Sequence, residues 1–168
     1  MKIPQHSLQI AICGVGQMGT GLVSCFKRAG YRVLAWDHDP EKLSTLERRV
    51  SKLDSWLDQN IGSPSKVGGA IQSVENLSVL DEEAEVVIEC IVEDLAEKVN
   101  LFRRFARSRE RGAIFLTTTS GLSITEIGQR SGCEQLLAGT HFWNPPYLMP
   151  LVEVIRGQNT PSEVIDRT

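Results

Sequence analysis

The sequence has no cysteine pair at metal-binding spacing, no long apolar run and no excess of basic charge. Its four cysteines, at positions 13, 25, 90 and 133, never form C-x-x-C, which argues against a zinc site. No apolar run approaches the roughly 20 residues of a membrane-spanning helix, and the first seven residues, MKIPQHS, hold no signal core. The net charge of −3 offers no basic face for nucleic acid. We therefore expect a cytoplasmic protein with free thiols, without a metal, a nucleic acid or a membrane as partner.

Strand-like and helix-like periodicities alternate along the 168 residues, which suit one domain with a sizeable core. This alternation predicts an α/β fold with a doubly wound, mostly parallel sheet. We expect strands at residues 8–13, 31–36, 85–92, 113–117, 136–140 and 151–155, and a short one around 77–79. Helices are expected at residues 18–29, 41–60, 94–109 and 123–132, and another begins near 161, whereas residues 61–69 are expected to form a loop.

The strongest local signal is the run Gly14-Val15-Gly16-Gln17-Met18-Gly19, which lies between a predicted strand and a predicted helix. In a dinucleotide-binding (Rossmann) turn, the first glycine makes the tight turn and the second lets the pyrophosphate approach the backbone. The third lets the helix pack closely on the sheet. The N–H groups that open the helix then face the phosphates.

Asp37 ends the second predicted strand, about 20 residues beyond the glycines, where the ribose-binding acid of such folds is found. A carboxylate there accepts hydrogen bonds from the adenosine 2′-hydroxyl and repels a 2′-phosphate, so NAD is favoured over NADP as cofactor. The alternative is a glycine-rich turn of another α/β fold, with Asp37 a surface loop residue.

His141 is placed just beyond the end of a predicted strand, where open α/β sheets bind ligands. Pro145, Pro146 and Pro150 indicate a bend after it, which would let the strand at residues 151–155 fold back and bring Glu153 beside His141. A carboxylate beside an imidazole raises its basicity and fixes its orientation, as a general base for an alcohol requires. On its own, His141 could equally be a core histidine.

With these features together, the chain resembles the L-3-hydroxyacyl-CoA dehydrogenases over nearly its whole length. The resemblance is carried by an ordered set of motifs: the glycine run at 14–19, VIECIVED at 87–94 with Lys98, TTTS at 117–120, HFWNP at 141–145 and LVEVI at 151–155.

The resemblance implies a role for each matching residue in NAD-dependent oxidation of a 3-hydroxyacyl substrate, as in β-oxidation of fatty acids. His141 matches the catalytic base and Glu153 its carboxylate partner. Ser120 matches a hydroxyl that contacts the substrate oxygen, and Asn144 a polar residue at the nicotinamide end. Glu93 and Lys98 match residues that line the cofactor pocket.

Three of these residues also have plain structural interpretations. Ser120 could be a turn-capping serine, and Lys98 on the residues alone is best interpreted as a solvated helix lysine. Glu93 could be an acid that complements a helix dipole.

Departures from the family pattern leave the substrate class open. Many members have Asn where this chain has Thr118. Residues 144–153 and 164–168 look equally like the lambda-crystallin-like gulonate 3-dehydrogenases, and the carnitine dehydrogenases are another CoA-free possibility. The segment 51–69, which helps to hold the CoA tail in acyl-CoA members, offers only Lys52 and Lys66 as phosphate partners. A non-catalytic dinucleotide-binding or structural module is the rival of another class.

The resemblance also implies a domain division. We expect residues 1–160 to form the NAD-binding domain and residues 161–168 to begin a helical C-terminal domain that this chain lacks. In the family that second domain closes over the substrate and supplies much of a homodimer interface.

Overall fold

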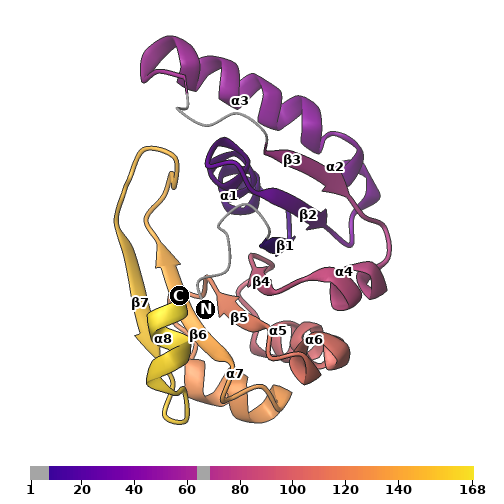
Figure 1. Ribbon diagram of the computed structural model, residues 1–168, viewed down its shortest axis with the longest axis vertical. Helices are drawn as coiled ribbons and strands as arrows, with labels where there is room; N and C mark the ends of the chain where they lie inside the picture. Colours follow the sequence, from indigo (N-terminus) through magenta and orange to yellow (C-terminus); the bar gives the residue numbers. More distant parts are fainter. Residues whose placement is uncertain (1–7, 64–68) are drawn as a thin grey trace.

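The computed structural model describes residues 8–63 and 69–168, and within them seven strands form one sheet in the order β3-β2-β1-β4-β5-β6-β7 (Figure 1). All neighbouring strands pair in parallel except β6 and β7, which are antiparallel. This confirms the predicted doubly wound, mostly parallel sheet. The strands are β1 (Gln9–Cys13), β2 (Arg32–Trp36), β3 (Ala70–Ser73), β4 (Val86–Glu89), β5 (Ile114–Thr117), β6 (Leu137–Phe142) and β7 (Val152–Arg156).

Eight helices of the described residues cover the two faces of the sheet. Because successive side chains of a strand point to opposite faces, each central strand feeds two cores: Ala11 of β1 packs with α4, α5 and α7, whereas Ile12 packs with α1, α3 and α8. The helices are α1 (Gln17–Arg28), α2 (Pro40–Ser44), α3 (Leu46–Asn60), α4 (Leu77–Glu83), α5 (Leu95–Arg103), α6 (Ala106–Glu110), α7 (Ile124–Ser131) and α8 (Ser162–Arg167).

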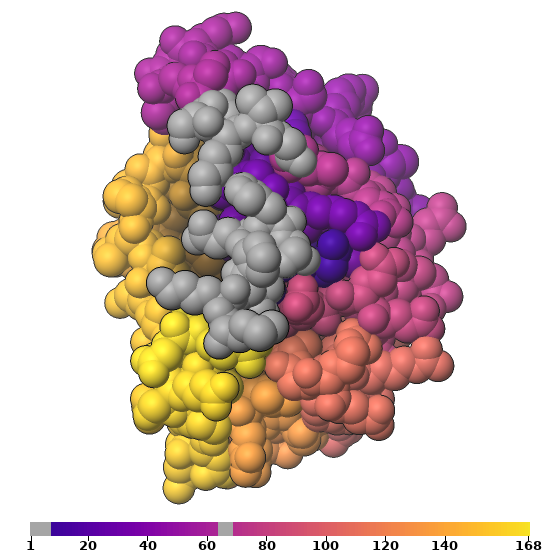
Figure 2. All heavy atoms as spheres, in the orientation of Figure 1, coloured from indigo at the N-terminus to yellow at the C-terminus, as the bar shows by residue number. Residues whose placement is uncertain are grey.

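Helix α8, drawn in yellow in Figure 2, contacts β6 and buries Val164 in the same apolar cluster as Ala138. No helix of the described residues is long and apolar enough to cross a membrane. All four cysteines are free thiols, as predicted.

The prediction of a strand at residues 77–79 is wrong. These residues open helix α4, because the Asn76 side chain caps it by accepting from the Ser78 N–H group at 2.9 Å. The strand of this region is β3, which pairs with β2 and lies earlier, at the end of the predicted loop. Residues 64–68 of that loop, and the N-terminal MKIPQHS, lie outside the described residues.

Two predicted helices are each divided in two. The helix expected at 41–60 breaks at Thr45, where α2 ends and α3 begins, and the helix expected at 94–109 breaks at residues 104–105 between α5 and α6. Side chains cap the starts of two predicted helices: Asp94 accepts from the Glu97 N–H group and Ser123 from the Glu126 N–H group.

The strand order reverses between β1 and β4, whose neighbours continue in opposite directions. In such sheets the crevice at the carboxyl ends of the strands, at this reversal, is where ligands bind. The glycine run follows β1 at this edge, and the loops after β4, β5 and β6 lie along the same edge because these strands are parallel.

Candidate active site

The glycine run forms the turn between β1 and α1, and two of its glycines are required by close backbone contacts. Gly14 has a φ of +94°, and a Cβ atom there would lie 2.6 Å from the Cys90 carbonyl oxygen. A Cβ atom on Gly19 would lie 1.9 Å from the Gly14 carbonyl oxygen. Gly16, the N-cap of α1, faces open space, so a cofactor can approach the backbone there. Gln17, exposed, and Met18, half-buried, form the first turn.

A cavity of about 570 Å³ opens above this turn and is lined by Gly14, Gly16 and Asp37, among other residues from β2, α5 and the loop after β4. Asp37 is 7% exposed, and its Oδ2 atom accepts from the Val15 N–H group at 2.8 Å while Oδ1 accepts from the Asp39 N–H group at 2.9 Å. An ionised carboxylate has about four acceptor positions, so Asp37 can shape the glycine turn and still accept from a ribose hydroxyl. These residues fit a dinucleotide.

The structure brings His141 and Glu153 together across β6 and β7. The two residues are paired in register, and His141 Nδ1 lies 2.6 Å from Glu153 Oε2. His141 was expected just beyond the strand, but it lies within β6, because the antiparallel pairing with β7 prolongs the strand to Phe142. An ionised carboxylate only accepts, so Nδ1 carries the proton and Nε2 of the neutral ring is free to accept one.

Trp143 is a member of this site that the sequence did not indicate. Its Nε1–H group donates to the same Glu153 Oε2 atom at 3.4 Å. The hydrogen bond from His141, and then that from Trp143, lower the pKa of Glu153 below its usual range. Glu153 is thereby kept ionised beside the imidazole, although 51% of its side chain is exposed.

Ser120 and Asn144 follow β5 and β6 at the same edge of the sheet, and both are exposed. Within the part of the chain that the structure describes, the Ser120 hydroxyl makes no hydrogen bond, and the turn is capped instead by Thr119, whose Oγ1 atom accepts from the Leu122 N–H group at 3.0 Å. The Ser120 hydroxyl is therefore available to a ligand. The Asn144 side-chain amide likewise makes no hydrogen bond to the described residues.

Glu93 and Lys98 do not line the cavity above the glycine turn. Lys98 is 1% exposed and its Nζ atom lies 2.6 Å from Glu89 Oε1, so the interpretation of Lys98 as a solvated helix lysine is wrong. Glu93 contacts Lys98 and the loop after β5 rather than acting only on the helix dipole. Sequence periodicity gave no signal for Glu89, which belongs to an otherwise apolar strand.

Fold and site together define a dinucleotide-binding α/β domain that presents a carboxylate-oriented imidazole at the ligand-binding edge of its sheet. Residues 9–168 match the family model of the 3-hydroxyacyl-CoA dehydrogenase NAD binding domain. The chain belongs to this family, and its cofactor is NAD.

Two curated relatives illustrate the range of the family. The protein of Bacillus subtilis named "Probable 3-hydroxybutyryl-CoA dehydrogenase" is 35% identical over 158 residues, covering 92% of this chain and 55% of the relative. An L-carnitine dehydrogenase of Nocardiopsis dassonvillei is 31% identical over 163 residues, covering 97% and 50%. The chain thus spans about half the length of these curated relatives.

Solved structures agree on the fold. The NAD⁺-dependent 5-formyl-3-hydroxy-2-methylpyridine 4-carboxylic acid 5-dehydrogenase superposes with a TM-score of 0.85 at 28% identity, over 95% of this chain and 52% of that one. The 3-hydroxybutyryl-CoA dehydrogenase of Escherichia coli K12 superposes with a TM-score of 0.80 at 27% identity, over 96% and 35%.

Proposed function

We propose that this chain is the NAD-binding, base-carrying part of a dehydrogenase that oxidises an L-3-hydroxyacyl-CoA to the 3-oxoacyl-CoA. The observation that carries the proposal is the hydrogen bond between His141 Nδ1 and Glu153 Oε2, at 2.6 Å, on the edge of the sheet where the glycine turn also lies. A domain that only binds a nucleotide has no use for an imidazole held in this way.

The proposed chemistry divides into a proton transfer and a hydride transfer. His141 Nε2 takes the proton of the substrate's 3-hydroxyl group, and Glu153 stabilises the imidazolium that forms. Bound NAD would supply the acceptor for the hydride that leaves C3. The hydroxyl of Ser120 would donate to the substrate oxygen, and the Asn144 amide would help to hold the nicotinamide end of the cofactor.

The CoA part of the proposal rests on a cavity of about 410 Å³ between α3 and the loop after β6. Its lining includes Lys52, Trp56 and Tyr147. Trp56 is exposed, so its indole ring is available to stack on a purine, and Lys52 can meet a phosphate. Lys66, the other expected phosphate partner, lies outside the described residues.

A CoA-free 3-hydroxy acid is the second candidate substrate. It is favoured by the likeness to L-carnitine dehydrogenases, of which the Streptomyces coelicolor protein is 32% identical over 165 residues. It is also favoured by Arg49, which lines the cavity but whose guanidinium group already donates to the backbone carbonyls of Val15 and Lys42 rather than to a CoA phosphate.

The test is single-turnover oxidation with the protein in excess, followed by the absorbance of the reduced nicotinamide. L-3-Hydroxybutyryl-CoA, free L-3-hydroxybutyrate and L-carnitine are compared. We expect the CoA ester to react fastest. His141→Gln and Glu153→Gln should each lower the rate by about tenfold or more while leaving NADH affinity unchanged.

Glu163→Gln, which removes an exposed acid of α8, is the matched control and should leave the rate unchanged. Lys52→Met should slow the single-turnover oxidation of the CoA ester alone. Faster oxidation of a free hydroxy acid would overturn the CoA assignment. NADH binding without any oxidation would leave a dinucleotide-binding module and overturn the proposed activity.

A further inference from the structure

A buried glutamate ends strand β4, on the face of the sheet that α5 and α7 cover. Glu89 is fully buried, and both of its carboxylate oxygens have partners. Oε1 accepts from Lys98 Nζ at 2.6 Å and from the Ile91 N–H group at 2.8 Å, and Oε2 accepts from the Thr117 hydroxyl at 2.6 Å. Glu89 therefore ties together the ends of β4 and β5 and the helix α5.

Lys98 connects this buried carboxylate to a second one. Its Nζ atom also lies 3.3 Å from Glu93 Oε2, so the ammonium group stands between two acids. Lys98 is buried and does not line the cavity above the glycine turn, and its two ion-pair partners among the described residues are Glu89 and Glu93. Its charge therefore acts on both acids.

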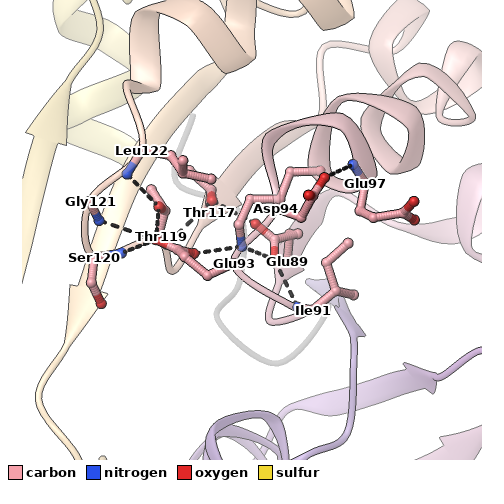
Figure 3. A network of polar contacts seen from close by, with 11 residues as sticks. Glu89, Ile91, Glu93, Asp94, Glu97, Thr117, Thr119, Ser120, Gly121 and Leu122 are labelled. Carbon is pink, nitrogen blue, oxygen red and sulfur yellow. Dashed lines mark hydrogen bonds and ion pairs between the residues drawn. The ribbon is translucent and has the colours of Figure 1, made fainter.

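Glu93 in turn contacts the loop after β5, as Figure 3 shows. Its Oε1 atom accepts from the Ser120 N–H group at 2.9 Å, from the Gly121 N–H group at 3.1 Å and from the Thr119 hydroxyl. Partial burial raises the pKa of Glu93, but these three hydrogen bonds and the charge of Lys98 outweigh it and lower the pKa below its usual range. Glu93 is thus held ionised at the loop.

The energetics favour an orienting role over a stabilising one. Burying an ion pair costs desolvation energy that its attraction often only balances, so a buried pair is weak support for stability. Burial raises the pKa of Glu89, and the charge and hydrogen bond of Lys98 offset this rise only in part. What the pair does supply is one fixed position for the Lys98 ammonium group, and hence for Glu93.

We propose that Glu89 is a positioning residue, which holds Lys98 against Glu93 and so fixes the backbone of Ser120 at the substrate side of the site. The proposed effect on the Ser120 backbone depends only on the hydrogen bonds and ion pairs described above. The effect on turnover rests on the proposed function, because it requires the Ser120 hydroxyl to contact the substrate.

The test measures hydrogen exchange of individual amides by NMR, together with NADH binding and kcat and KM. In Glu89→Gln and in the double variant Glu89→Gln with Lys98→Met, exchange at Ser120 and Gly121 should rise by about tenfold, because their acceptor loses its anchor. Glu89→Gln alone leaves the buried Lys98 charge without its main partner and can therefore prevent folding. The double variant removes both buried charges, so it can be measured even if the single variant does not fold. We expect kcat to fall and the KM for NAD to change little.

Asp81→Asn is the matched control for lost stability. Asp81 is a buried carboxylate of α4 that accepts from the N–H groups of Arg107 and Ser108, away from this loop. It should lower global stability without a selective change at Ser120 and Gly121. If these two amides respond to the Glu89 variants only as they do to Asp81→Asn, the proposal is wrong. If they respond selectively but wild type oxidises no substrate, the positioning role stands and the proposed function fails.

Discussion

Glu153 Oε2 accepts from two aromatic N–H groups, and this is the residue-scale feature on which the proposed base depends. Both bonds are stronger while Glu153 is ionised, because a charged carboxylate is a better acceptor than a neutral carboxyl group. The two donors therefore favour the charged carboxylate, and the charged carboxylate in turn favours one tautomer of His141. The pair acts as a unit whose orientation is set on β7.

This unit predicts an acid-shifted titration of Glu153. The pKa of Glu153 is lowered, first by the His141 hydrogen bond. The contact is therefore fully present above the ordinary glutamate pKa and is lost as pH falls through the lowered value of the folded chain. We expect the carboxyl carbon of Glu153 to titrate, by NMR, with a midpoint below the usual glutamate range.

His141→Phe should return this midpoint toward the ordinary value, since it removes the larger cause of the shift. Trp143→Phe should return it by a smaller amount. A midpoint that His141→Phe leaves in place would show that another group lowers the pKa, and that the hydrogen bond is not maintained in solution.

The same residues show how far the sequence determines the site. The glycine turn was predictable because its three glycines lie within six consecutive residues of the chain. The pairing of His141 with Glu153 was predictable because a proline-rich bend joins two neighbouring strands. The burial of Lys98 was not, because it depends on Glu89, which no periodicity distinguishes from the apolar residues around it. The contact of Glu93 with Ser120 spans 27 positions and likewise has no local signal.

At the scale of elements, Arg49 joins helix α3 to the glycine turn. Its Nη1 atom donates to the Val15 carbonyl at 2.9 Å and contacts the Thr20 hydroxyl, and Nη2 donates to the Lys42 carbonyl at 2.6 Å. The break at Thr45 lies between Lys42 of α2 and Arg49 of α3. One side chain thus fixes the cofactor turn against two helices.

Arg49→Met should keep the packing of the side-chain stem but leave carbonyl acceptors without a donor. We expect the free energy of unfolding to fall by about 1–3 kcal/mol, measured by urea denaturation, and the affinity for NADH to weaken because the turn is held less firmly. Arg48→Met, at the exposed neighbouring position of the same helix, is the control and should change neither quantity. Equal effects of the two substitutions would contradict the role of Arg49.

A helix or strand could be predicted where a turn residue lies at the end of a periodic apolar pattern. The prediction was less accurate where a capping side chain determines which of the two forms. Helix α7 ends at Gly132, with a φ of +74°, as the glycine indicates. At residues 77–79 the apolar residues suit a strand or a helix equally, and the Asn76 cap selects the helix. A long periodic segment conceals the break between α5 and α6 in the same way, since Leu101 and Phe102 of α5 and Phe105 at the break all pack in one core cluster.

At the scale of the whole molecule, the proposed site stands open to water. The side chain of His141 is 29% exposed, and β7, at the edge of the sheet in Figure 1, is exposed along its length. Seven large apolar residues between positions 143 and 155 are exposed beside the pair: Trp143, Leu148, Met149, Leu151, Val152, Val154 and Ile155. Electrostatic stabilisation of a developing charge is weaker in water than in a closed, dry site.

We therefore expect this 168-residue chain to bind NADH yet to oxidise L-3-hydroxybutyryl-CoA slowly, with kcat below about 1 s⁻¹, the low end of the range for enzymes. Steady-state kinetics with saturating NAD measure it. Faster turnover would mean that the edge formed by β6 and β7 already excludes enough water, and that the exposure of Glu153 does not limit the reaction.

A deuterium label on C3 of the substrate identifies which step is slow. In an enzyme that closes over its substrate, opening and product release often limit kcat and mask the isotope effect on the chemical step. Because the described residues leave His141 and Glu153 partly exposed, we expect product to leave quickly and the breaking of the C3–hydrogen bond to limit the rate. We expect the full primary isotope effect on kcat. A ratio near one would contradict an open, chemistry-limited site and would point to a slow conformational step within the described fold.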